Sequence, residues 1–352
     1  MRVAVFNDTR PDKGHYGCAL VMDRIDDLVR NLGGTIVFLW PLDLDWRDNL
    51  DLLPKEGDVD LLIVNGEGSI HGAPKNKRAV SLSSLGKLAK HYFKVPSVLL
   101  NATICDNDVE LYDELKFFDI VWVRDLKSVE ICGENGVFAR YCPDLTLTTP
   151  LPESFTVERS GVGVTDSVDR VSDFELRRVS QRLSADFLPM VSDAPSSFSE
   201  FRKFRFGKIK AWMRAVWLNF KFDSLQRPKS VSEFLDWLRS KELIVTGRYH
   251  TVTMCLLTET PFLFLSSNTF KTEALCADSG LNIGRKIEDL TRFNWDKSVG
   301  SFRFSEAELL NLRRFRGDCL ERFVQMRKSI SDLCVPFFSD EVKAEEVEGR
   351  VE

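Results

Sequence analysis

The chain has 352 residues, 43% of them hydrophobic and 29% charged, which is typical of a globular protein large enough for two domains. Its net charge of -5 argues against a general nucleic-acid-binding protein, because such a protein needs a basic surface to bind phosphates. No apolar run approaches the roughly 20 residues of a membrane span, and the opening MRVAVFNDT predicts a first strand rather than a signal peptide.

Eight cysteines are scattered along the chain, without a CxxC pair and without a Cys/His cluster at the spacing of a zinc site. Most of them have apolar neighbours in the sequence, where a free thiol behaves as a small hydrophobe. We therefore expect reduced cysteines, a cytoplasmic protein and no metal site. The cysteines are Cys18, Cys105, Cys132, Cys142, Cys255, Cys276, Cys319 and Cys334.

The first elements predict a doubly wound sheet. An apolar strand over Arg2–Asn7 is followed by a polar loop, a helix over Cys18–Leu32 and a second strand over Thr35–Leu39. The loop carries His15, and the start of its helix could present backbone N–H groups to an anion.

A near-continuous apolar strand over Asp60–Asn65 runs into the turn Gly66-Glu67-Gly68-Ser69-Ile70-His71-Gly72. Glycines at a strand end let the backbone approach a ligand closely or form a tight turn. The turn is not a dinucleotide or phosphate-loop fingerprint, so it predicts no nucleotide. Glu67 and His71 could serve as acid/base groups; the alternative is a tight turn whose polar side chains face water.

The rest of the first half continues the pattern, and its predicted helix over Val80–Phe93 leads to strands over Ser97–Asn101, Ile120–Val123 and Phe138–Cys142. Arg124 follows the second of these strands, where an arginine can grip a carboxylate or phosphate. The alternative is a salt bridge to Asp125 or to another acid. We expect a Rossmann-like domain over residues 1–147 and a linker over 148–160.

A second α/β domain is predicted over residues 161–300, with a strand at 161–165, a helix over Ser172–Leu183 and a strand over Asp186–Val191. Residues 200–229 form a basic insertion with nine Lys/Arg, two acids and interleaved aromatics. Such a segment suits the surface of an anionic membrane. It would equally suit a helix that packs its aromatics on the domain, and the acidic chain disfavours nucleic acid as a partner.

The stretch Leu243–Leu275 predicts strand, helix and strand, with strands at Leu243–Val245 and Phe262–Leu265. Ligands of open parallel sheets collect beyond the carboxyl ends of the strands. Two polar turns follow these strands and deliver Arg248, His250 and Lys271 to one edge, which favours an anion site.

The end of the chain is predicted to hold short elements at Leu281–Lys286 and Leu290–Phe293, followed by a long amphipathic helix over Glu306–Ser331. We expect residues 301–338 to brace the first domain. Residues 339–352 carry six acids and two bases, which predicts a disordered acidic tail.

With these motifs in hand, nearly the whole chain resembles the polysaccharide pyruvyl transferase family. The resemblance is carried by Asn7-Asp8-Thr9 with the His15 loop, DLLIVNGEGSIHG, VWVRDLKS with PDLTL, and GRYHTVTMCLLTETPFLFLSSNTFK. Family members usually show three glycines where this chain has Gly66-Glu67-Gly68.

The resemblance implies two Rossmann-like domains with a cleft between them, similar to the GT-B glycosyltransferase architecture, and an active site in that cleft. It also implies transfer of pyruvate from phosphoenolpyruvate onto two hydroxyls of a sugar, giving a cyclic ketal and phosphate. The expected acceptor is a sugar or lipid-linked glycan of a bacterial surface polymer, with no cofactor. The enzyme would act in the cytoplasm, at the inner face of the membrane if 200–229 contacts lipid.

Phosphoenolpyruvate carries a carboxylate and a phosphate, so its site needs several cations. The expected cations are Arg124, Arg248 and Lys271. A histidine suits the proton transfers, and His250 is the expected acid/base residue beside the donor. His71, with Glu67 or His15, would handle the acceptor hydroxyls or the leaving phosphate. The remaining expected substrate-binding residues are Asn7, Gly66, Gly68 and Ser69.

Two other functions fit the same sequence. A glycosyltransferase of the same shape would need a carboxylate for the ribose of a nucleotide sugar, and Glu273 is the only acid close in sequence to the key turn. A non-catalytic glycan-binding protein would use the cationic strand ends only to hold an anion.

Overall fold

The computed structural model describes residues 1–10, 14–150, 158–191, 228–295 and 297–348. The chain divides into two compact units. The first comprises Met1–Asp8, Asp23–Leu145 and Asp318–Glu352, and the second comprises Thr9–Met22 and Thr146–Gly317. The sequence placed the end of the first domain at 147, close to this division. It did not place the loop that carries His15 in the second unit.

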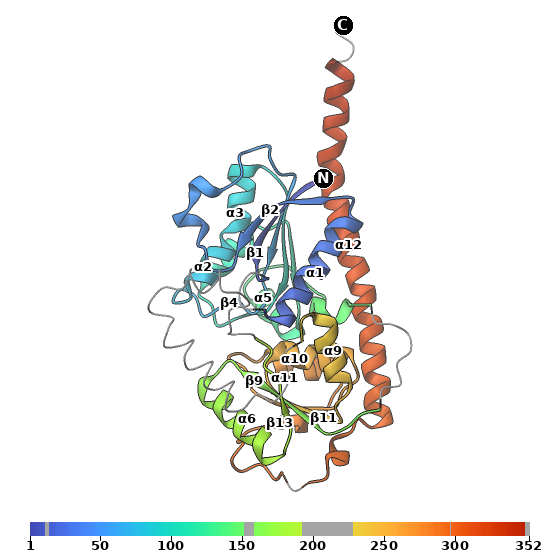
Figure 1. Cartoon of the computed structure of the whole chain (residues 1–352). Helices are drawn as coiled ribbons and strands as arrows, with labels where there is room; N and C mark the ends of the chain where they lie inside the picture. Colours follow the sequence, from blue (N-terminus) through green and yellow to red (C-terminus); the bar gives the residue numbers. More distant parts are fainter. Residues whose placement is uncertain (11–13, 151–157, 192–227, 296, 349–352) are drawn as a thin grey trace. The chain divides into compact units, whose positions relative to one another are not determined.

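The first unit is built on a parallel six-stranded sheet with the order β2-β1-β3-β5-β7-β8 (Figure 1). Its central strands are buried from end to end because helices cover both faces. The order reverses between β1 and β3, so the carboxyl ends of these two strands flank the switch point where ligands bind open α/β sheets. The strands are β1 (Arg2–Asp8), β2 (Thr35–Pro41), β3 (Leu61–Asn65), β5 (Ser97–Ala102), β7 (Ile120–Val123) and β8 (Ala139–Tyr141).

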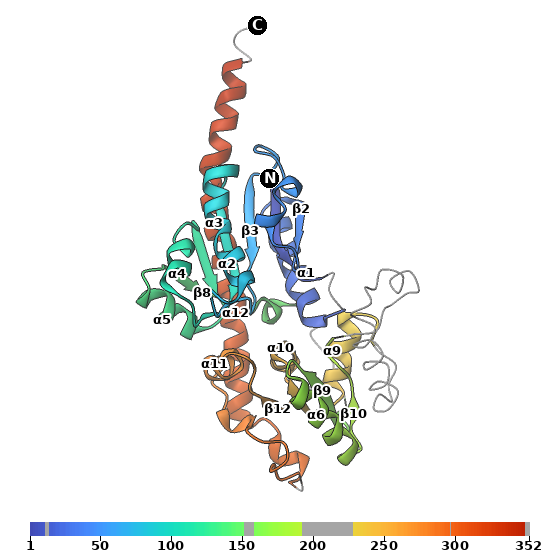
Figure 2. The same cartoon turned by 90° about the vertical axis from the view of Figure 1, so that its left-hand side faces the viewer.

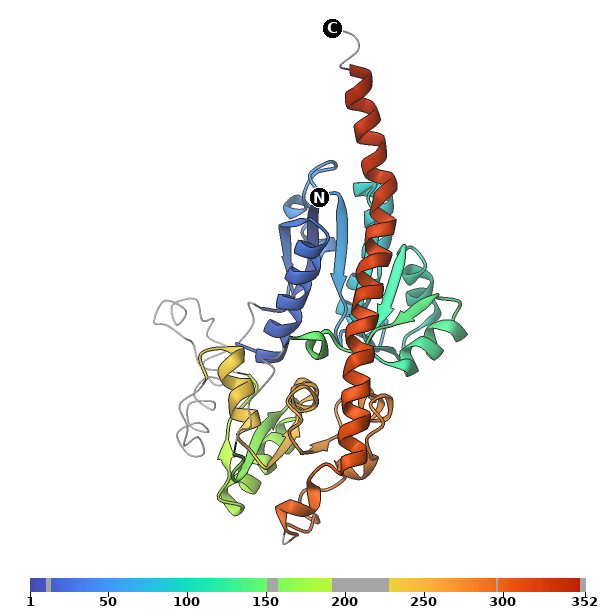
Figure 3. The same ribbon diagram turned by 90° about the vertical axis from the view of Figure 1, so that its right-hand side faces the viewer.

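One face of this sheet packs against the helices that follow β3, β5 and β7 in one continuous apolar core. Helix α1 (Tyr16–Asn31) and the last helix lie on the other face (Figure 3). The Arg24 guanidinium lies over the ring of Phe323 there, 5.0 Å from its centre. The covering elements are α2 (Lys77–Ser83), α3 (Leu85–Leu88), η3 (Ala89–Phe93), α4 (Val109–Leu115) and α5 (Leu126–Glu134). Smaller elements are η1 (Trp46–Asp48), η2 (Leu50–Leu52), η4 (Leu145–Thr148) and the parallel pair β4 (Ile70–His71) and β6 (Ile104–Cys105).

The single helix predicted over Val80–Phe93 is wrong in detail, because the structure breaks it into α2, α3 and the π-helical turn η3. The break falls at two serines. Ser83 Oγ donates to Val80 O at 3.1 Å and Ser84 Oγ to Ser81 O at 2.9 Å. Side-chain bonds of this kind compete with the helical backbone bonds.

The second unit has a parallel five-stranded sheet with the order β10-β9-β11-β12-β13, and its switch point lies between β9 and β11 (Figure 2). Helix α6 packs on the face that carries Val164 and Val245. Helix α9 lies on the opposite face, where its Trp237 ring approaches Gly163. The strands are β9 (Val162–Ser167), β10 (Asp186–Phe187), β11 (Leu243–Gly247), β12 (Phe262–Leu265) and β13 (Lys286–Ile287). The helices are α6 (Arg170–Arg182), α9 (Val231–Arg239), α10 (Tyr249–Leu257), α11 (Lys271–Asp278), η6 (Ile283–Arg285) and η7 (Val299–Phe302).

Two predicted elements of this unit are wrong. The strand expected over Asp186–Val191 ends at Phe187, because Pro189 has no N–H to donate to the sheet. Leu290–Phe293 forms a turn rather than a regular element. Leu290 and Phe293 instead fill the apolar core beneath the sheet.

The last helix, α12, runs over Glu306–Glu348. The predicted disordered tail from 339 is therefore wrong for residues 339–348. The segment is rich in helix formers, and the next glycine comes only at 349. No helix among the described residues is long and apolar enough to cross a membrane. Residues 200–227, which hold nearly all of the basic aromatic segment, lie outside the described residues.

Candidate functional site

The second unit gathers polar side chains at the switch point of its sheet. Strand β9 ends with Asp166 and Ser167, and Arg248 follows the end of β11. Because these strands are neighbours and parallel, both ends lie at the same edge of the sheet. The edge therefore combines a carboxylate with the arginine that the sequence singled out.

Asp166 holds Arg248 in a fixed orientation. Arg248 donates to Asp166 Oδ2 from Nε at 2.8 Å and from Nη2 at 2.5 Å. Asp166 Oδ1 accepts from the backbone N–H of Met190 at 2.6 Å, which anchors the carboxylate itself. The aspartate side chain is 6% exposed and the arginine side chain 19%. Sequence reasoning missed Asp166, although a polar residue at the end of the unit's first strand was a signal for it.

His250 and Lys271 both lie close to the ring of Tyr249. The Tyr249 and His250 ring centres are 5.4 Å apart, and Lys271 Nζ lies 5.9 Å from the Tyr249 ring centre. Lys271 Nζ also donates to Asn268 Oδ1 at 2.9 Å. The sequence placed both residues in turns, but His250 lies in the first turn of α10 and Lys271 begins α11.

The His15 loop belongs to the same unit and reaches the same cluster. The ring of Tyr16 stacks on Phe234 at 4.6 Å, and its hydroxyl donates to Pro228 O at 2.7 Å. This anchoring places the His15 ring edge-on to His250, with 5.3 Å between the ring centres. The structure therefore brings together four of the predicted residues, Arg248, His250, Lys271 and His15.

A buried acid lies behind the Arg248–Asp166 pair. Burial raises the pKa of the Asp173 carboxyl, and the charge of Asp166 raises it further, while Arg177 opposes the shift. Arg177 Nε donates to Asp173 Oδ2 at 3.3 Å.

The first unit has its own polar cluster at its switch point. Asn7 Nδ2 donates to Asn65 O at 2.5 Å, and Asn65 Nδ2 donates to Glu67 Oε1 at 3.0 Å. Asn7, Glu67 and Asn101, at the ends of β1, β3 and β5, adopt positive φ values of 67°, 40° and 58°. Such conformations are costly outside glycine and concentrate at functional sites. Asn7 is a predicted site residue, whereas Asn65 and Asn101 were missed.

The glycine turn after β3 is tightly packed. A Cβ on Gly66 would lie 2.5 Å from the Cβ of Ala102, so only glycine fits beside the end of β5. Gly68 follows Glu67 in the same turn, and the Ser69 N–H donates to Gly66 O at 3.0 Å. His71 lies two residues further on, in β4, which pairs with β6. Glu67 and His71 thus belong to the first unit, whereas His250 belongs to the second.

Arg124 lacks the exposure that a substrate-binding cation needs. This corrects the prediction that Arg124 binds the carboxylate or phosphate of the substrate. Its side chain is 1% exposed and donates from Nη1 to Asp144 Oδ2 at 2.9 Å and from Nε to Thr103 Oγ1 at 2.9 Å. The salt-bridge alternative holds, with Asp144 as the partner in place of Asp125.

The neighbouring Asp125 and Ser128 also have structural roles. Asp125 caps α5 by accepting from the Ser128 N–H at 2.7 Å, and Ser128 Oγ accepts from the Ile104 N–H at 2.9 Å. The R-D-x-x-S motif therefore ties β7, α5 and β6 together.

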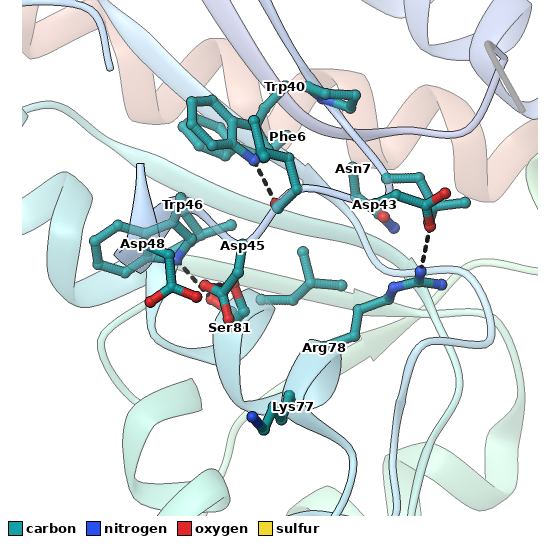
Figure 4. Close-up of a pocket in the computed structure, with 15 residues that line it drawn as sticks. Phe6, Asn7, Trp40, Asp43, Asp45, Trp46, Asp48, Lys77, Arg78 and Ser81 are labelled. Atoms are coloured by element: carbon teal, nitrogen blue, oxygen red, sulfur yellow. Dashed lines mark hydrogen bonds and ion pairs between the residues drawn. The ribbon is translucent and has the colours of Figure 1, made fainter. Parts of the chain in front are cut away.

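A pocket of about 240 Å³ opens beside Asn7 in the first unit (Figure 4). Three carboxylates and two cations line it, and Arg78 Nη2 forms an ion pair with Asp43 at 2.8 Å. Asn7 is 1% exposed, and its Oδ1 has no hydrogen-bond donor among the described residues. The polar lining residues include Asn7, Asp43, Asp45, Asp48, Lys77, Arg78 and Ser81.

Within the described ranges of the chain, one group of side chains could hold a metal ion. His15, Cys18 and His250 each offer a ligand atom, and these atoms lie within 4.8 Å of one another. The sequence predicted no metal site because the three residues are not at zinc spacing along the chain. The fold brings them together.

Two doubly wound parallel sheets, each with polar residues at its switch point, define an α/β protein of two Rossmann-like domains, as the sequence predicted. Residues 15–269 match the polysaccharide pyruvyl transferase model, and the chain belongs to this family. Membership makes it a transferase whose family moves pyruvyl groups onto polysaccharide.

Solved structures with similar folds are distant in sequence. The UDP-GlcNAc 2-epimerase of Methanocaldococcus jannaschii is 12% identical, with 89% of this chain and 99% of that chain covered and a TM-score of 0.48. The UDP-GlcNAc 2-epimerase of Neisseria meningitidis is 11% identical, with 96% and 100% covered and a TM-score of 0.46. None of the curated proteins matches the chain.

Proposed function

We propose that the protein transfers pyruvate from phosphoenolpyruvate onto two hydroxyls of a sugar in a surface glycan or its lipid-linked precursor. The family supports the transfer of pyruvyl groups in general. The observation that supports this donor is the grouping of Arg248, Lys271 and His250 in one unit, at one edge of its sheet.

The second unit binds the donor in this proposal. Phosphoenolpyruvate presents a carboxylate and a phosphate, and a planar guanidinium matches either group with two parallel hydrogen bonds. Asp166 fixes the Arg248 guanidinium before the substrate arrives, which lowers the cost of ordering it. Lys271 and His15 supply the further cationic contacts.

His250 is the proposed acid that protonates the donor. As a sugar hydroxyl attacks carbon 2 of the enol, carbon 3 takes a proton and the hydroxyl loses one, so one group must give a proton and another must accept it. Attack by the second hydroxyl then expels phosphate and closes the ketal. A histidine suits the donor side because imidazole can exchange protons near neutral pH.

The first unit binds the acceptor. Carboxylates and amides accept and donate hydrogen bonds to sugar hydroxyls, and the pocket beside Asn7 offers both kinds of group. Asn7 Oδ1, which accepts no hydrogen bond among the described residues, would accept one from a sugar hydroxyl. Glu67 and His71, which belong to the same unit, are the proposed groups that deprotonate the acceptor.

Phosphate release from phosphoenolpyruvate tests the proposal, measured with purified protein and a panel of methyl glycosides and lipid-linked oligosaccharides. We expect acceptor-dependent release that falls at least about tenfold in Arg248→Lys, since lysine keeps the charge but loses the bidentate geometry. Arg292→Lys is the matched control, because this arginine of the same unit is 88% exposed.

The opposite outcome would be no release with any acceptor, together with thermal stabilisation by a nucleotide sugar but not by phosphoenolpyruvate. That result would favour a glycosyltransferase. The carboxylate of Glu273, which such an enzyme could use for ribose, accepts from Ser266 Oγ at 2.6 Å and lies 3.6 Å from Lys286 Nζ.

A further inference from the structure

We propose that His15, Cys18 and His250 bind a thiophilic divalent cation such as Zn²⁺. The bound ion then prevents His250 from donating or accepting a proton in the proposed reaction. Two imidazoles and a thiol offer ligand atoms within 4.8 Å of one another. Binding itself does not depend on the proposed reaction, whereas its effect on turnover does.

The three residues form a preorganised group. The backbone N–H of Cys18 donates to His15 Nδ1 at 3.2 Å, and this hydrogen bond holds the two ends of the turn together. Tyr16 fixes this turn to the second unit through its ring contact with Phe234 and its hydrogen bond to Pro228 O. His250 is held by its position in the first turn of α10. Small side-chain movements are enough to bring three ligands to one ion.

Gly17 makes the approach to His250 possible. A Cβ at Gly17 would lie 2.2 Å from the Cβ of His250 and 2.7 Å from its Nδ1, closer than real side chains approach. The loop therefore packs directly on the His250 ring, and only glycine allows that distance. The same contact holds the Cys18 thiol close to the ring.

The ligand set favours zinc and chemically similar ions. Imidazole nitrogen and thiolate sulfur are both ligands of Zn²⁺, and a set of three protein ligands leaves a fourth position for water or substrate. Cys18 lies in the first turn of α1, directly after Gly17 and close to His250. Ligation through His15 Nδ1 would replace its hydrogen bond from Cys18 N–H, and the metal–nitrogen bond offsets that loss.

Cys18 is the only described cysteine that is not buried. Burial raises the pKa of Cys132 and Cys142 to about 12 and that of Cys334 to about 11, so these thiols resist the deprotonation that metal binding requires. The other cysteines thus provide natural controls for the site.

Cobalt spectroscopy tests binding without requiring turnover. Full-length protein, freed of metal with a chelator, is titrated with Co²⁺ and followed by the thiolate-to-cobalt charge-transfer band in the near ultraviolet. We expect a saturable band that Zn²⁺ abolishes. The affinity should fall by at least about tenfold in His15→Asn, and the band should disappear in Cys18→Ala, while Cys334→Ala keeps it, since even outer partners of a metal site are worth 10 to 100-fold.

Absence of the band in the unmodified protein, or its persistence in Cys18→Ala, would overturn the proposed site. The effect on His250 is tested separately. Micromolar Zn²⁺ should inhibit pyruvyl transfer by the unmodified protein and not by Cys18→Ala, which keeps its basal rate. Full pyruvyl transfer activity with the ion bound would contradict the proposal that the ion prevents His250 from acting as an acid or base. A protein that binds cobalt but never turns over phosphoenolpyruvate would refute the proposed function and leave the metal site established.

Discussion

The guanidinium of Arg248 is positioned by a carboxylate at the end of a different strand, 82 residues earlier in the chain. A cation on a flexible side chain binds an anion weakly until its orientation is fixed, because ordering it costs entropy. The Asp166 contacts remove this cost before the substrate binds. The same contacts partly neutralise the charge of Arg248. In the proposed function, the attraction for the anionic donor therefore comes from Arg248, His250, Lys271 and His15 together.

Substitution of Asp166 tests this positioning role. In Asp166→Asn the amide can still accept from Met190 N–H but no longer holds Arg248 as a charged partner. We expect kcat/KM for phosphoenolpyruvate to fall by about 10 to 100-fold, with most of the loss in KM. Asp289→Asn is the control, since this aspartate caps an exposed turn in the same unit. An unchanged KM would show that Arg248 needs no support from Asp166.

Arg124 illustrates a different case, a cation whose side chain is buried in an ion pair with Asp144. Removing one partner of a buried ion pair leaves the other charged and unsolvated, at a cost of about 3–5 kcal/mol. Arg124→Met should therefore lower the free energy of unfolding by about this amount, measured by urea denaturation.

The double variant Arg124→Met/Asp144→Leu should recover part of the loss, because no buried charge remains. If Arg124→Met instead folds normally and only raises KM for phosphoenolpyruvate, the arginine contacts substrate and the structural assignment fails.

At the scale of elements, short polar contacts fix how each helix leaves its strand. Asp125 caps α5, and Asp169 caps α6 by accepting from Ser172 N–H at 2.8 Å. Each cap satisfies a backbone N–H that the helix cannot pair internally. The start of α12 is tied to the second unit in a similar way. Arg313 donates two hydrogen bonds of 2.8 Å to Glu259, in the turn before β12.

The Arg313–Glu259 pair predicts a change in stability with pH. The hydrogen bonds from Arg313 lower the pKa of Glu259 below its ordinary value of 4.5. Between these two pKa values the unfolded chain binds more protons than the folded one, so stability falls as pH decreases through this window.

Arg313→Met should remove this contribution. We expect a loss of up to about 1 kcal/mol at pH 7, because exposed pairs are weak, and no difference from the unmodified protein below the folded pKa. Urea denaturation across the acid range measures both. Arg314→Met, at the neighbouring exposed arginine, is the control. A loss that persists undiminished in acid would point to lost packing rather than lost charge.

At the scale of the whole molecule, each unit is assembled from distant parts of the chain. The first unit needs Asp318–Glu352, and the second needs Thr9–Met22. Helix α12 contributes five buried side chains to the first unit, and Arg322 lies over the Tyr141 ring at 4.9 Å. The buried side chains are Cys319, Phe323, Met326, Ile330 and Cys334.

Truncation tests this assembly. Removing residues 318–352 exposes the apolar surface beneath those five side chains, of which Phe323, Met326 and Ile330 are each worth about 1.5–3 kcal/mol when fully buried. The sum is comparable to the whole stability of a domain, so we expect the first unit not to fold. Removing only 339–352 should leave the melting temperature nearly unchanged, because the buried side chains described in α12 end at Cys334. Equal stability of both truncations would contradict this account.

Local patterns in the sequence were enough to predict most of the fold. The apolar runs at Leu61–Asn65, Ile120–Val123 and Phe262–Leu265 appear as strands, because a parallel strand covered on both faces must be apolar throughout. The family could also be recognised, since its motifs follow these strands at fixed distances. Arg248, His250 and Lys271 were predicted as site residues by a similar rule, that ligands of open sheets bind beyond the strand ends.

Only the tertiary structure decided which polar residues meet. It paired Arg124 with Asp144, oriented Arg248 by Asp166 and brought His15 and Cys18 to His250, more than two hundred residues away in the chain. A local pattern in the sequence shows that a residue follows a strand, because the run of apolar residues just before it identifies the strand. It does not show which other strand end lies beside it, because that contact depends on sheet order and on how the loops return.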